Sequence, residues 1–173
     1  MKKLVFLIYF ISIKFAVASS NVVYLDVQYI IDQSELGIFY KKKLNVIKES
    51  NQSGLIKKEK EIKKYENEIK NKKNILKKEE IDNEILKLNK IIKEYQVERK
   101  NKNQLFLDEK KKYTSKILNI INPLLTKYVE TNKIDLVIEK KNILIGIKTL
   151  DITNQILILL NEETQKKKLI NEN

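Results

Sequence analysis

The order of hydrophobic and polar positions predicts a strand at the start of the chain, followed by a long helix. Residues 21–28, NVVYLDVQ, form a short β-branched run that is typical of a buried strand. Residues 29–33 have the length of about one helical turn. Ser34 followed by Glu35 then predicts the start of a helix, because serine is a favourable helix cap.

Two long stretches in the middle of the chain repeat their hydrophobic residues at the spacing of a coiled coil. The spacings are three, four and seven residues in the first stretch, and four and three in the second. Such narrow seams predict two helices that pack against each other along one stripe. The predicted seam residues are Ile62, Tyr65, Ile69 and Leu76 in the first helix and Ile81, Ile85, Leu88 and Ile92 in the second.

The phase of this repeat breaks between Leu76 and Ile81, which are five residues apart in an otherwise polar stretch. We therefore expect a turn near residues 78–83 that folds the two helices into an antiparallel hairpin. A single continuous helix with a discontinuity is the alternative. Arms of about 45 residues would extend about 65 Å, at a rise of about 1.5 Å per residue.

Two short segments interrupt the helical pattern. Residues 51–54, NQSG, are poor helix formers and are either a hinge or a tolerated irregularity, since Gly alone costs about 1 kcal/mol relative to Ala. Asn122-Pro123 interrupts the second helix, because proline removes one backbone hydrogen bond and kinks the chain. The apolar spacing then resumes and ends near Asn132.

The chain returns to a β pattern after the second helix. Residues 135–139 (DLVIE) and 142–147 (NILIGI) flank Lys140-Lys141, which predicts a β-hairpin with a short polar turn. Together with the first strand this gives three short strands, a poor independent core whose edges must be covered or paired with another chain. Self-association is therefore expected.

A last helix is predicted from Thr153 to Asn161, capped by Asp151 or by Thr153 itself. Residues 165–173 are polar and are expected to fray. The predicted organisation is a helical hairpin over residues 34–117, a discontinuous β-body from residues 19–33 and 118–162, and a polar tail over residues 163–173.

Residues 1–18 have the pattern of a secretory signal peptide. Two lysines precede an apolar run of about ten residues, too short to span a bilayer, which needs about 20. Ala16-Val17-Ala18 is a small-x-small cleavage signal, so cleavage after Ala18 and export are expected. An uncleaved amphipathic helix or membrane anchor is the alternative.

Composition removes most catalytic chemistry. The chain has neither His nor Cys, which excludes His acid–base catalysis, thiol nucleophiles and the usual zinc ligands, and it predicts no cofactor. Asp26 and Asp151 fall near the predicted body, but an Asp at a strand or helix start is usually structural. A non-enzymatic protein is therefore expected.

Positive charge is confined to the middle of the chain. Residues 41–116 contain 24 basic and 13 acidic residues, a net charge of +11, and 34 of the 35 basic residues of the chain are Lys. Export and the lack of aromatic-basic RNA motifs argue against a nucleic-acid partner. The remaining alternative to a binding protein is a structural coiled-coil scaffold, although a spacer needs no strand at each end.

The two ends of the chain resemble the Skp/OmpH family of periplasmic chaperones. The resemblance is carried by Val23–Gln28 with Ile31, Ser34 and Gly37, and by Asn122–Leu125, Asp135–Lys140 and Asp151–Thr153 with Ile156 and Leu160-Asn161. The lysine-rich arms match the family only in character.

This resemblance implies an α+β, mostly helical fold that assembles as a jellyfish-like homotrimer, whose arms surround a cavity that holds unfolded outer-membrane proteins in the periplasm. It leaves contact with lipopolysaccharide or a membrane surface open. Four lysines opposite the seam are candidates to line the cavity or to form a solvated outer face: Lys60, Lys64, Lys78 and Lys90. The expected trimer body contains Val23, Leu25, Val27, Val137, Ile138 and Leu144.

Overall fold

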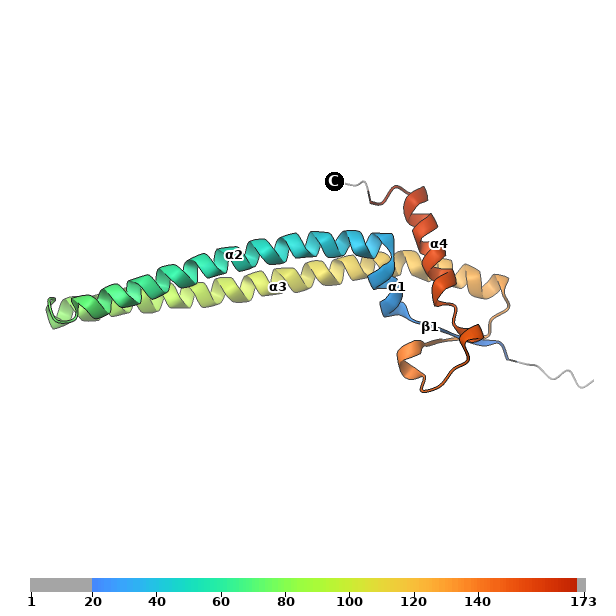
Figure 1. Ribbon diagram of the computed structural model, residues 1–173, viewed down its shortest axis with the longest axis horizontal. Coiled ribbons are helices and arrows are strands. Elements are labelled where there is room, and N and C mark those ends of the chain that lie inside the picture. Colours follow the sequence, from blue (N-terminus) through green and yellow to red (C-terminus); the bar gives the residue numbers. More distant parts are fainter. Residues whose placement is uncertain (1–19, 171–173) are drawn as a thin grey trace, which may run out of the picture.

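The chain forms a long two-helix arm that projects from a small body, as the computed structural model shows for residues 20–170 (Figure 1). The arm consists of α2 (Glu35–Lys72) and α3 (Lys78–Thr131). The predicted fold class, a mostly helical α+β chain with a helical hairpin, is confirmed. The predicted signal peptide and its cleavage after Ala18 lie outside the described residues.

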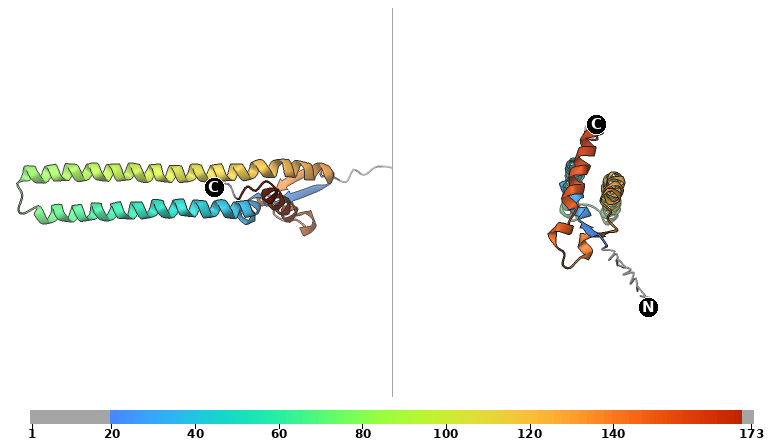
Figure 2. Two further views of the ribbon diagram at one scale, coloured as in Figure 1. Left: turned by 90° about the horizontal axis from the view of Figure 1, so that it is seen from above. Right: turned by 90° about the vertical axis from the view of Figure 1, so that its right-hand side faces the viewer.

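The body combines elements from both ends of the chain with the base of the arm. Its elements are β1 (Val22–Leu25), α1 (Val27–Gln33), β2 (Leu136–Glu139) and α4 (Thr153–Lys166), with two short 3-10 turns at Lys140–Asn142 and Lys148–Leu150. Seen from above and along the arm, the two arm helices run side by side, and α4 crosses their base (Figure 2).

The two segments expected to interrupt the helices do not end them. Helix α2 continues through residues 51–54 without a break, as expected for a tolerated irregularity. Helix α3 continues past Pro123 to Thr131, so Asn122-Pro123 does not end the helix, and the resumed apolar spacing ends close to Asn132 as predicted. Proline removes one backbone hydrogen bond, and the other hydrogen bonds of a long helix hold the remaining turns in place.

The turn of the hairpin lies earlier than predicted, between Lys72 and Lys78 rather than at residues 78–83. The backbone N–H of Lys77 donates to Glu80 Oε2 at 3.0 Å, which caps the start of α3. Glu79 and Glu80 lie in the first turn of α3, where carboxylates are favourable next to the positive end of the helix dipole. The polar run that suggested a turn is therefore the first turn of a helix.

The sheet has two parallel strands, and the predicted β-hairpin is wrong. Strand β1 pairs with β2 in the register Val22 to Leu136 and Leu25 to Glu139, and an isolated bridge joins Tyr24 to Asp151. Residues 143–147 instead form an irregular loop over the ring of Tyr24, whose hydroxyl donates to the carbonyl of Ile147 at 3.2 Å. A Cβ on Gly146 would lie 2.8 Å from that ring, so this close approach requires glycine.

The body core is aliphatic and is built where α1, α2, α3 and α4 meet. Strand β1 ends at Leu25, earlier than predicted, and Asp26 caps α1 by accepting a hydrogen bond from the N–H of Tyr29 at 2.9 Å. Gly37 permits the contact of α2 with α1, because a Cβ there would lie 1.7 Å from a backbone oxygen of α1. The buried core residues are Val23, Leu25, Ile30, Leu36, Ile117, Ile121, Ile134, Ile152, Ile156 and Leu160.

The C-terminal segment is more ordered than the sequence indicated. Helix α4 extends to Lys166 rather than ending at Asn161, and Thr164 is buried. Beyond the helix, Lys168 adopts a left-handed backbone (φ 54°), and the N–H of Leu169 donates to the carbonyl of Thr164 at 3.1 Å. This helix-terminating turn places two apolar residues, at 169 and 170, against the core, so the predicted fraying is wrong for residues 165–170, and the rest of that prediction lies outside the described residues.

Candidate functional site

The seam between α2 and α3 is narrow. Six of the predicted seam residues face the partner helix and are buried or half-buried. They are Ile62, Tyr65, Ile69, Ile81, Leu88 and Ile92. The other two predictions need correction. Leu76 lies in the turn rather than in α2, and Ile85 is 41% exposed because Glu84 occupies the adjacent inward position.

Polar side chains reinforce this seam. The hydroxyl of Tyr65 donates to Glu84 Oε2 at 2.7 Å, and the hydroxyl of Tyr95 donates to Glu59. Hydrogen bonds from the Lys87 ammonium and from Tyr65 lower the pKa of Glu84. These groups are at most partly buried, so each pair contributes little to stability, and the arm is held by many weak contacts.

The four candidate lysines, Lys60, Lys64, Lys78 and Lys90, are all exposed. Only Lys64 has an ion-pair partner among the described residues, Glu68, with the Nζ and Oε1 atoms 3.9 Å apart. The described part of one chain thus presents these charges to solvent. Their position relative to a cavity between arms stays a prediction.

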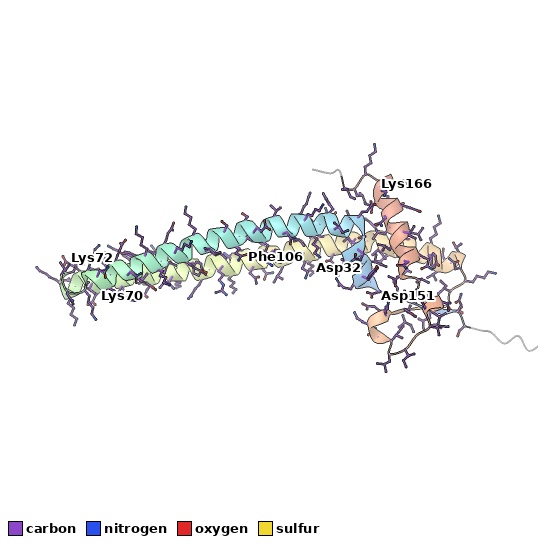
Figure 3. All side chains as sticks on the ribbon, viewed as in Figure 1. Asp32, Lys70, Lys72, Phe106, Asp151 and Lys166 are labelled. Atoms are coloured by element: carbon purple, nitrogen blue, oxygen red, sulfur yellow. The ribbon has the colours of Figure 1, made fainter. Side chains whose placement is uncertain are left out.

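The free end of the arm is strongly basic and has an apolar tip. Ile75 lies in the turn and is 80% exposed. Figure 3 shows Lys70 and Lys72 at this end of the arm, far from the body. The exposed lysines that flank Ile75 in the sequence are Lys70, Lys72, Lys73, Lys77 and Lys78.

The body carries a second exposed apolar segment, which sequence reasoning placed in a strand. Val23 and Leu25 are buried, and Val27, Val137 and Ile138 are half-buried. Leu144, which was expected in the trimer body, is fully exposed in the single chain at 102%, and Ile145 is 93% exposed. The loop makes no strand pairing within the described chain, and the side chains of Leu144 and Ile145 lie in solvent.

The carboxylates that could have suggested an enzyme have structural partners. Asp151 accepts hydrogen bonds from the backbone N–H of Thr153 at 3.0 Å and from Lys140 Nζ at 3.0 Å. Burial alone would raise the pKa of Asp151, but the hydrogen bonds from the Thr153 hydroxyl, the Thr153 backbone N–H and the Lys140 ammonium together outweigh it and lower the pKa. Across residues 20–170, no group of three or more His, Cys, Asp or Glu side chains is placed to hold a metal ion.

Within the same part of the chain, no helix combines the length and the apolar character needed to cross a membrane.

The sequence matches the family described as "Outer membrane protein (OmpH-like)" over residues 21–160. The chain belongs to the OmpH-like family. The matched region begins before β1 and extends into α4, so it covers the arm and the body together. The resemblance noted at the two ends of the sequence is therefore confirmed.

A solved OmpH-like structure has the same fold. It is a crystal structure from Caulobacter crescentus CB15 of a protein classed as an OmpH-like outer membrane chaperone. The two chains superpose with a TM-score of 0.72 at 13% sequence identity, over 84% of this chain and 86% of that one. At this identity the likeness establishes the shared fold. Among curated proteins, none matches the chain.

Proposed function

We propose that this OmpH-like protein is a periplasmic holdase, which binds unfolded outer-membrane proteins after export and prevents their aggregation without catalysing a reaction. Membership of the OmpH-like family supports a chaperone. The observation that carries the proposal is the net charge of +11 over residues 41–116, nearly all of it on an extended, solvent-exposed arm. Such a field attracts acidic segments and raises the rate of capture.

Capture and holding have different physical origins in this proposal. Screening at physiological salt limits the field to about 8–10 Å, so it acts mainly on chains that are already close to an arm. Exposed apolar side chains along the arm then provide weak contacts, among them Leu86, Val97 and Leu105. Salt should therefore change the association rate more than the dissociation rate.

Assembly into a homotrimer through the body would surround such a client with arms. The exposed loop at Leu144 and Ile145 and the open edges of the two-stranded sheet are the surfaces that favour self-association. Lys60, Lys64, Lys78 and Lys90 would then line the cavity between the arms.

The tip of the arm is the place at which contact with lipopolysaccharide or an anionic membrane surface would occur. Clusters of lysines bind anionic surfaces with about 1 kcal/mol per residue, and Ile75 adds an apolar side chain at the centre of the cluster. Because the chain has no Trp, Ile75→Trp provides a unique fluorescent reporter. The emission maximum of this Trp should shift to the blue when phosphatidylglycerol vesicles are added. An emission maximum that is the same with vesicles as in buffer alone would refute the contact.

The holdase function is tested by aggregation of an unfolded outer-membrane barrel. The mature protein should suppress light scattering at near-stoichiometric trimer, without nucleotide, and capture should slow as salt rises. Replacing the four cavity lysines together by Gln should slow capture while the helices persist, because Gln is a good helix former. A structural scaffold would give no protection at any salt concentration.

A matched variant removes the same charge from outside residues 41–116, by replacing Lys127, Lys141, Lys148 and Lys166 with Gln. Capture by this variant should remain close to that of the unaltered protein. If both fourfold variants slow capture equally, net charge rather than the position of the arm lysines is responsible.

A further inference from the structure

One face of the arm has a gap in its seam. A groove of about 940 Å³ lies between α2 and α3, partway along the arm near Phe106 (Figure 3). Asn51 and Gln52 line it from α2. Asn51 occupies a turn at which the periodic pattern would place a large apolar side chain, so the poor helix formers at residues 51–54 leave the space between the helices unfilled.

The groove continues toward the tip of the arm. A second hollow of about 340 Å³ shares Glu59, Tyr95 and Arg99 with the first and extends to Glu66 on α2. From Lys48 to Glu66 the helix rises about 27 Å, at about 1.5 Å per residue. An extended polypeptide advances about 3.3 Å per residue, so a segment of about eight residues matches this length.

The lining combines an apolar floor with basic rims. Leu55, Ile56 and Phe106 provide apolar surface. Arg99 is the single arginine of the chain and lies on the rim with Lys48. Within the described residues neither forms an ion pair, whereas the lining carboxylate of Glu59 accepts a hydrogen bond from Tyr95.

We propose that this groove binds an extended segment of unfolded polypeptide in which large apolar side chains alternate with carboxylates. The apolar side chains contact the floor at Leu55 and Phe106, and a carboxylate forms a two-point hydrogen-bonded pair with Arg99, whose planar guanidinium suits that geometry. This site presupposes the holdase function proposed above and places one binding site within a single arm. A bilayer surface is flat and does not enter a groove between two helices.

The test measures fluorescence anisotropy of a labelled ten-residue peptide of alternating Phe and Asp with the mature protein. Asn51→Leu fills the gap, so peptide affinity should fall about tenfold while the thermal midpoint stays the same or rises, since Leu is the better helix former. Gly54→Ala is the matched control. Gly54 does not line the groove, and its Cβ would meet only the flexible end of the Lys102 side chain, at 3.7 Å from Nζ, so the change should stabilise the helix and leave peptide affinity unchanged.

Arg99→Gln should also weaken peptide binding about tenfold, whereas Lys148→Gln, which removes the same charge from the body, should change affinity less than about twofold. Unchanged affinity in Asn51→Leu, equal losses in Arg99→Gln and Lys148→Gln, or displacement of the peptide by phosphatidylglycerol vesicles would each overturn the groove site. No peptide binding together with normal suppression of barrel aggregation would overturn the groove but not the holdase. If the unaltered protein neither binds the peptide nor suppresses barrel aggregation, the holdase function itself would be overturned.

Discussion

The exposed loop on the body gives a sharp test of assembly. Leu144 and Ile145 are 102% and 93% exposed, so they contribute almost nothing to the fold of their own protomer. Replacing both with Ser should therefore leave the helices of the protomer intact. If the loop lies between copies, the same change removes two large side chains from each copy's interface.

The magnitude follows from the area that the loop would bury. Full burial of one Leu or Ile side chain contributes about 1.5–3 kcal/mol, so the pair contributes about 3–6 kcal/mol per protomer. Since about 1.4 kcal/mol is a tenfold change, association should weaken at least about a hundredfold. Light scattering after size-exclusion chromatography should show the unaltered mature protein as a trimer and the double variant as a monomer at micromolar concentration.

Thermal unfolding followed by circular dichroism provides a second readout. The midpoint of an assembled protein rises with protein concentration, and that of a monomer does not. Leu86→Ser combined with Leu105→Ser, two exposed positions on the arm, is the control and should keep the trimer. A double loop variant with the mass and the concentration dependence of the unaltered protein would refute the interface.

Two further predictions concern the body. Gly37→Ala should destabilise the protein by about 3 kcal/mol or more in chemical denaturation, because its Cβ would lie 1.7 Å from a backbone oxygen of α1. Gly54→Ala, whose Cβ would make only an ordinary contact with the end of the Lys102 side chain, should instead stabilise it by about 1 kcal/mol, and equal effects at the two glycines would contradict the packing of α1 on α2. Asp151 has a lowered pKa in the folded state, so its contribution to stability is complete above its ordinary pKa of about 3.9 and is lost as pH falls through the folded value. Asp151→Asn should show a weaker loss of stability in acid, and an identical acid profile would exclude this role.

The parts of the fold that the sequence predicted are those set by periodicity. The spacing of Ile62, Ile69 and Leu88 predicted two helices in contact, and these residues lie between α2 and α3. Ser34 was expected to start a helix, and its Oγ accepts a hydrogen bond from the N–H of Gly37 at 3.1 Å. Both signals depend on neighbours within a few residues along the chain, which a sequence displays directly.

The errors lie where distant segments decide the outcome. The run at residues 142–147 has the composition of a strand, but its path is set by the ring of Tyr24, more than a hundred residues earlier. Helix α4 extends past Asn161 because Gln165 donates to Glu35 at 2.9 Å and Thr164 is buried in the body. The groove beside Asn51 could be suspected from a polar residue at a seam position, but its continuity required both helices to be in place.

The division of hydrophobic burial between body and arm fits the proposed function. Of the buried hydrophobic side chains in the described part of the chain, only Ile69 lies on the arm away from the body. The arm therefore gains little stability per residue from its seam, and the net charge of +11 over residues 41–116 adds repulsion between neighbouring turns. If the protein is the proposed holdase, an acidic client bound to the arm would relieve this repulsion, and by linkage it would stabilise the arm. The weak seam would then allow the arm to adapt to unfolded chains of different shape, while the aliphatic core would keep the body intact.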